Sequence, residues 1–90
     1  VKRNAHGRKA LTVISRFDPS VPASQHVRTV GAPAWTAVRV YLARHSLLGG
    51  PEQRLLTQVT SGPVGYVRGD DATALLSLYV TAVNHGWQEQ

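Results

Sequence analysis

The chain has no cysteine and no methionine, and it has no long hydrophobic run. Without cysteine it cannot form a disulfide framework, and it has no thiolate for catalysis or metal binding. The longest uncharged stretch, residues 72–88, contains several polar side chains and is shorter than the roughly 20 apolar residues of a membrane-spanning helix. The apolar run at residues 11–14 is shorter than the core of a secretory signal, about 7–15 residues. We therefore expect a soluble, cytoplasmic protein.

Acidic side chains are scarce, and none lies in the first 16 residues. Later in the chain five arginines balance five carboxylates, so the remainder is neutral. Residues 1–9 have almost no apolar side chain to pack, which predicts a basic flexible arm. Such an arm suits contact with phosphates, because each contact releases counterions; the alternative is a solvated terminus that only aids solubility. The net charge of +5 comes from Lys2, Arg3, Arg8, Lys9 and Arg16.

Length and hydrophobic content predict one folded unit. The chain has 90 residues, which is long enough for one hydrophobic core and too short for two. Its hydrophobic fraction of 42% is sufficient to form that core. No internal repeat or low-complexity segment is visible. We expect a single small globular domain over residues 10–90, preceded by the arm.

Two consecutive segments have the apolar spacing of amphipathic helices. The first is expected from Pro33 to Gly49. The second follows the break at residues 49–51, where glycine can end one helix and proline can begin the next. It should end at residues 61–63, after two to three turns. The apolar stripe of the first helix comprises Trp35, Val38, Leu42 and His45.

A third helix is predicted from Asp70 and Asp71, which would cap its N-terminus, through His85. Gly86 then occupies the position after the helix where a left-handed residue is common, and Trp87 is placed to fold back on the last turn. The core stripe of this helix would comprise Ala72, Leu75, Tyr79 and Ala82.

Three shorter segments are rich in β-branched residues and are candidates for short strands. They are residues 10–15, residues 26–30, where the alternation is poor, and residues 63–69, which could be an edge strand paired with the first or an ordered loop. The expected fold is therefore mainly α (α+β), with three helices and one or two short strands. A strand beside a helical pair would make a helix-turn-helix or winged arrangement.

The second predicted helix has a polar face that suits base recognition. Arginine and glutamine are the side chains that best match guanine and adenine edges in the major groove. His45 is bulky where a helix-turn-helix normally has a small residue, and an ordinary solvated helix face is the alternative. The proposed reading residues are Gln53, Arg54, Thr57 and Gln58, with Lys2, Arg3, Arg8 and Lys9 on the phosphates.

The third predicted helix has an outer strip with no charge. Exposed helix faces of monomers usually carry lysine, glutamate or arginine, so this strip suits packing on another chain, most simply in a homodimer. An uncharged solvent face is the alternative. The strip comprises Thr73, Ser77, Thr81 and Asn84.

The four histidines do not have the spacing of a metal site or a catalytic motif. Ser46 and His45 are adjacent and would point apart on a helix, and the pair Asp70–Asp71 is better explained as a cap than as an acid–base pair. His45 is expected in the core, and His85 suits the negative end of its helix. We therefore expect no catalytic residue, no metal and no cofactor.

Together these features favour a small, non-enzymatic DNA-binding or other nucleic-acid-binding regulatory protein, expected to be a homodimer. The basic arm would contact phosphates, and the second helix would read bases. The alternative is a protein-interaction or assembly subunit, in which the neutral body and the uncharged strip bind another protein.

Overall fold

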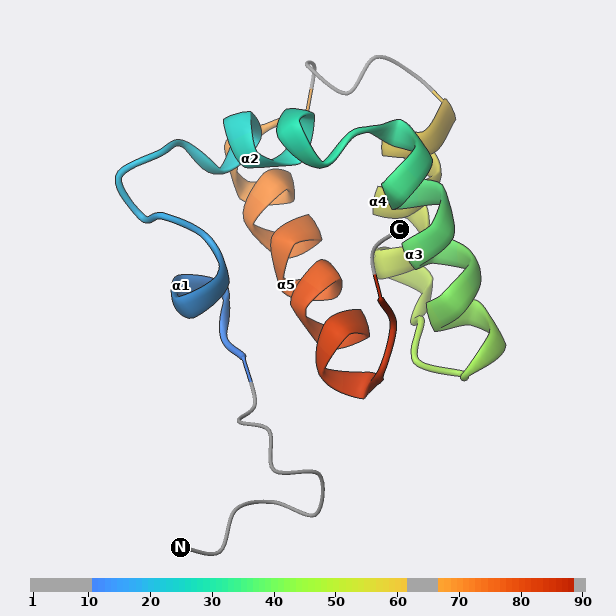
Figure 1. Ribbon diagram of the computed structural model, residues 1–90. Helices are drawn as coiled ribbons and strands as arrows, with labels where there is room; N and C mark the ends of the chain where they lie inside the picture. The colour runs from blue at the N-terminus through green and yellow to red at the C-terminus, as the bar shows by residue number, and fades with distance from the viewer. Residues whose placement is uncertain (1–10, 62–66, 89–90) are drawn as a thin grey trace, which may run out of the picture.

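The computed structural model describes residues 11–61 and 67–88, and within these ranges it contains five helices and no strand (Figure 1). The expected mainly helical class is confirmed. The short strands expected at residues 10–15 and 26–30 are wrong: residues 13–15 and 26–30 are helical, residues 11 and 12 are in no strand, and residue 10 lies outside the described residues. The helices are α1 (Val13–Arg16), α2 (Ala23–Val30), α3 (Ala32–Arg44), α4 (Gly50–Ser61) and α5 (Gly69–His85).

Helix α5 is the centre of the fold, and each of the other four helices contacts it. The expected stripe is buried, and Leu76, Leu78 and Val80 are buried as well. Because buried residues surround this helix on several sides, it can support α1 and α2 on one side and α3 and α4 on the other (Figure 1). Ser77 and Thr81 lie on the side that stays exposed.

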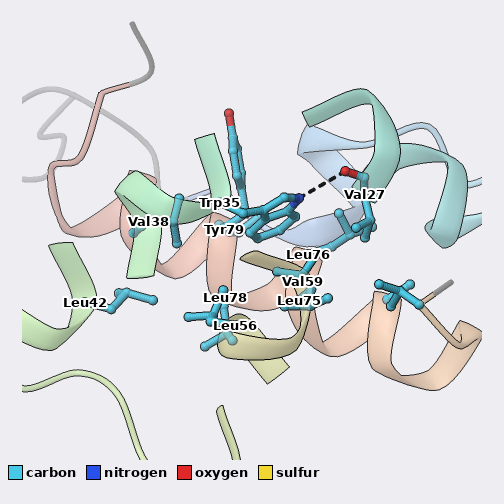
Figure 2. Packing of buried hydrophobic residues seen from close by; sticks show 14 of the residues in the cluster. Val27, Trp35, Val38, Leu42, Leu56, Val59, Leu75, Leu76, Leu78 and Tyr79 are labelled. Atoms are coloured by element: carbon cyan, nitrogen blue, oxygen red, sulfur yellow. Dashed lines mark hydrogen bonds between the residues drawn. The ribbon is translucent and has the colours of Figure 1, made fainter. Parts of the chain in front are cut away.

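Trp35 connects three helices in the core. Its side chain is fully buried, and its indole Nε1 donates a hydrogen bond of 3.0 Å to the carbonyl oxygen of Val27 on α2 (Figure 2). Its ring meets Tyr79 of α5 edge-on, with centroids 5.8 Å apart. Burying an indole requires a partner for its N–H, and the end of α2 supplies that partner.

Helix α3 ends at Arg44, five residues before the expected end at Gly49. The amide of Leu47 donates to Leu42 O at 2.9 Å, and the amide of Ser46 donates to Ala43 O at 3.2 Å. This is the Schellman pattern, in which the residue after the helix cap takes a left-handed conformation. Here that residue is Ser46, with φ of 57°. A left-handed residue after a helix is usually glycine, and here it is a serine. The end of α3 at Arg44 therefore could not be recognised from the sequence.

The predicted second helix is confirmed as α4. Its buried residues are Leu56 and Val59, which pack into the common core, while Leu55 is partly buried against it. Tertiary packing of this face stabilises a helix that would be marginal alone. After residues 45–49, α4 runs back along α3 in the opposite direction, so the two form a helical hairpin (Figure 1).

The predicted third helix is confirmed as α5, with one correction at its start. The N-cap position is Arg68, which makes no side-chain capping hydrogen bond, and Asp70 and Asp71 lie in the first turn. Their charges still suit the positive end of the helix dipole there. At the other end the prediction holds: Gly86 has φ of 135°, and the amide of Trp87 donates to Ala82 O at 2.9 Å.

The N-terminal region is helical because local caps and contacts with α5 outweigh its β-branched composition. The Thr12 side chain caps α1 by accepting a hydrogen bond of 3.2 Å from the amide of Ser15. Phe17 and Val27 are buried in the core that α5 organises. Of the third expected strand, residues 63–66 lie outside the described residues, residues 67 and 68 are not in a strand, and Gly69 begins α5.

Candidate nucleic-acid interface

The four predicted base-reading residues are brought together on one exposed face of α4. This face is opposite the buried residues Leu56 and Val59. Within the described ranges no carboxylate oxygen lies within 4 Å of the Arg54 guanidinium, so its donors are available to a ligand. A hollow on the protein surface is lined by Gly50, Gln53, Arg54, Thr57 and Gln58.

The connection between α3 and α4 bears on the helix-turn-helix prediction. Such motifs join two helices at about 90–120° through a turn of three to four residues. Here residues 45–49 form the connection, and α4 returns alongside α3 as a hairpin (Figure 1). His45 is exposed, which corrects its expected place in the core. The hairpin gives no support to the helix-turn-helix, which stays a prediction. The exposed face of α4 does not depend on it.

The four arm residues Lys2, Arg3, Arg8 and Lys9 lie outside the described residues, but the point where the arm joins the body is described. The side-chain oxygen of Asn84 accepts a hydrogen bond of 2.7 Å from the amide of Leu11. The Asn84 amide nitrogen donates one of 2.6 Å to the Leu11 carbonyl oxygen. Leu11, the first described residue, thus lies at the C-terminal end of α5. Helix α5 lies between α1 and α4 in Figure 1.

Arg16, the fifth residue of the positive N-terminal segment, is attached to the body. One of its guanidinium nitrogens donates to the Tyr79 hydroxyl at 3.2 Å. Its charged carbon lies 5.3 Å from the ring centroids of both Phe17 and Tyr79, within the range of cation–π attraction. This cation helps to hold α1 against α5.

The predicted partner strip on α5 is exposed at all four positions. The hydroxyls of Thr73 and Thr81 donate to carbonyl oxygens one turn earlier in the same helix, at 3.2 and 2.9 Å. Because these hydroxyls are already hydrogen-bonded, a partner could cover them without leaving an unsatisfied donor. Asn84 differs, because it is occupied by the hydrogen bonds to Leu11.

An apolar hollow beside this strip was not predicted. It has a volume of about 250 Å³ and lies where α1 and the start of α2 meet α5. Ile14 on its rim is 74% exposed, the most exposed large hydrophobic side chain in the described ranges. Sequence reasoning missed it because residues 10–15 were taken for a strand. Its lining includes Val13, Phe17, Val21, Thr73 and Leu76.

A second feature that the sequence did not reveal is a cluster of Tyr41, His45 and His85. The Tyr41 hydroxyl lies 2.6 Å from His85 Nδ1. The His45 ring centroid lies 4.3 Å from that of Tyr41 and 4.7 Å from that of His85. Tyr41 and His45 are one turn apart in the sequence, but only the tertiary structure brings the end of α5 to them.

The other described histidine, His26, is engaged within the N-terminal region. Its Nε2 lies 3.0 Å from the carbonyl oxygen of Asp18, and its ring packs on Phe17 with centroids 4.9 Å apart. Across residues 11–61 and 67–88 there is no group of three or more histidine, cysteine, aspartate or glutamate side chains that could hold a metal ion.

Comparison with known proteins found no match: no family, no curated protein and no solved structure resembles the chain. In the described part of the chain, no helix combines the length and the apolar character needed to cross a membrane.

Proposed function

We propose that the protein is a non-enzymatic nucleic-acid-binding protein of the cytoplasm that reads bases with α4. The observation that carries this proposal is the exposed face of α4, where Arg54 has no carboxylate partner in the described ranges and is accompanied by Gln53, Thr57 and Gln58. These side chains can donate to and accept from base edges. The opposite face of α4 is buried, which would hold the reading face in a fixed orientation.

The basic arm would supply the sequence-independent part of the affinity. Nine residues can extend about 30 Å from their attachment beside Asn84, which is enough to follow a phosphate backbone around the body. The described attachment point, Leu11, lies beside Asn84 on α5 and not on α4, so phosphate contacts of the arm would add to the base contacts of α4 rather than replace them. Phosphate contacts would position the duplex, and α4 would provide the specificity.

The proposal is tested by fluorescence anisotropy with duplex DNA over a series of salt concentrations. Deleting residues 1–9 removes four cations and should reduce the salt slope by up to about 3.6, from 0.9 per phosphate contact. Arg54→Ala should weaken binding to a preferred sequence by about 5- to 150-fold, corresponding to about 1–3 kcal/mol for a base contact.

Arg28→Ala on α2 is the matched control, since it removes the same charge from an exposed helix position away from α4. It should leave sequence preference unchanged. Absence of DNA binding at 50 mM salt would contradict the proposal, as would equal losses in the Arg54 and Arg28 variants.

A second candidate function, assembly with another protein chain, is favoured by the surface beside α1. The exposed Ile14, the apolar hollow and Thr73 of the uncharged strip adjoin one another. A projecting side chain beside a hollow can be self-complementary about a two-fold axis, with each Ile14 entering the hollow of the other copy. We therefore propose a homodimer through this surface as the alternative.

Light scattering across a dilution series tests the homodimer. Ile14→Lys and Ser77→Lys should convert a dimer mass to a monomer mass, because each would bury a charge in the contact. Thr57→Lys on α4 is the control and should keep the dimer. A monomer mass of the unaltered protein at every concentration would exclude self-association. Dimer loss with DNA affinity intact would separate the two functions.

A further inference from the structure

The C-terminal ends of α3 and α5 bring two imidazole rings together on the surface. His45 follows α3 directly and His85 is the last residue of α5. Both are exposed, their centroids are 4.7 Å apart, and the ring planes are inclined at 56°. No hydrogen bond occupies the His45 ring within the described ranges, so both of its nitrogens are available.

Tyr41 sets the orientation of His85. Its hydroxyl oxygen lies 2.6 Å from Nδ1, close enough to accept a proton carried there. Either group can be the donor in this hydrogen bond; with a metal ion on Nε2, Nδ1 would carry the proton and the tyrosine oxygen would accept it, as in histidine metal ligands generally. This arrangement leaves His85 Nε2 as the nitrogen available to a ligand.

The spacing of the rings fits a shared metal ion. With metal–nitrogen distances of about 2.0–2.1 Å and an angle of 90–110° at the metal, two imidazole centroids lie about 4.5–5.2 Å apart. The observed separation of 4.7 Å is within this range. The C-terminal ends of α3 and α5 both lie at this part of the surface, and the partial negative charge of a helix C-terminus favours a cation.

We propose that His45 and His85 form a two-histidine site for a divalent transition-metal cation, with Tyr41 as a positioning residue hydrogen-bonded to His85. Imidazole ligands suit copper, zinc and nickel, and among these Cu²⁺ binds nitrogen sites most strongly. Water completes the coordination, since the described residues offer no group of three ligands. The metal would join α3 to α5 and so stabilise the folded state.

The site is tested by titrating the full-length protein with Cu²⁺ and following thermal unfolding and electron paramagnetic resonance. The unaltered protein should unfold at a higher temperature with Cu²⁺, and its spectrum should show two nitrogen ligands. His45→Ala and His85→Ala should each lower the affinity at least about tenfold, because one imidazole cannot chelate. His6→Ala is the matched control for binding by the arm and should retain the site.

Tyr41→Phe separates the positioning role from mere packing. It keeps the ring but removes the oxygen, and loss of such a partner costs about 10–100-fold in metal affinity. Should a variant fail to fold, nuclear magnetic resonance of the unaltered protein still tests the site. If both imidazoles bind one metal ion, adding Zn²⁺ must shift the ring signals of His45 and His85 together. Equal Cu²⁺ affinity in the His85→Ala variant, or shifts confined to other histidines, would overturn the site.

Discussion

Helices α3, α4 and α5 have 13, 12 and 17 residues, whereas α1 and α2 have four and eight. The longer three have recognisable apolar faces and start or stop signals, and all three were predicted from the sequence. The shorter two overlap segments rich in β-branched residues, and residues 13–15 of α1 and 26–30 of α2 were predicted as strands. The difference shows that a short helix can be decided by the surface on which it packs rather than by propensity.

The N-terminal region, residues 11–30, is held to α3 and α5 by a few specific contacts. Asn84 binds the backbone of Leu11, Arg16 binds Tyr79, and Trp35 binds the carbonyl oxygen of Val27. The Phe17 ring also meets Tyr79 edge-on, with centroids 5.6 Å apart. Because these contacts differ in burial, changing them one at a time should reveal how far the two regions unfold together.

Trp35→Ala is expected to have the largest effect, since the indole is fully buried between both regions. It should lower the free energy of unfolding by about 3–5 kcal/mol through lost transfer energy and a cavity. Urea unfolding followed by circular dichroism measures this change. One cooperative transition would show that residues 11–30 and the longer helices unfold together. Two transitions would show that they unfold separately.

Asn84→Ala should act on the N-terminal region alone. Losing the two hydrogen bonds to Leu11 should cost about 1 kcal/mol, partly offset by the better helix propensity of alanine. Hydrogen exchange should become faster for amides of α1 while those of α4 keep their protection. Ser77→Ala, on the same exposed side of α5, is the control. Equal acceleration in α1 and α4 would contradict a local role for Asn84.

Ser46→Gly should stabilise the helical hairpin. Ser46 has φ of 57°, a left-handed conformation that costs a non-glycine residue about 1 kcal/mol, so glycine relieves strain at some expense in chain entropy. The expected gain is about 0.5 kcal/mol, measured as a higher urea midpoint with an unchanged slope. Ser61→Gly, at the end of α4, is a control that should not stabilise. A lower midpoint for Ser46→Gly would contradict the proposed strain.

The smallest expected effect is an acid dependence in the N-terminal region. The Ser20 amide and hydroxyl donate to the Asp18 carboxylate at 2.9 and 2.8 Å, and with nearby His26 they hold the pKa of Asp18 below its usual value. A lowered pKa stabilises the folded state above about pH 4, the ordinary range of an aspartate. This contribution is lost as the pH falls through the lowered value.

Asp18→Asn should therefore lower stability slightly near neutrality, where the charged carboxylate contributes fully, and change it little at the acid end, so the acid dependence becomes weaker. Thermal unfolding between pH 2 and pH 7 measures the effect. An unchanged acid profile would show that the Ser20 contacts do not contribute to folding.

The candidate site was predictable where its residues share one helix. Gln53, Arg54, Thr57 and Gln58 follow from the 3.6-residue period, because burial of Leu56 forces the other face outward. The same helical period predicted that the strip on α5 is exposed. It could not predict that Asn84, one residue of this strip, binds Leu11. It also could not pair His45 with His85, since local spacing carries no information about contacts between distant segments.

The sequence by itself determined the three long helices, the turn after α5 at Gly86 and the faces that remain exposed. Each follows from a local pattern: the apolar period, or a glycine where the backbone needs a positive φ. Only the tertiary structure decided that residues 13–16 and 23–30 are helical and that Ser46 takes the turn after α3. For residues 13–16 and 23–30, packing against α5 outweighs the weak strand preference of their β-branched side chains. At Ser46, formation of the α3–α4 hairpin outweighs the cost of a left-handed serine.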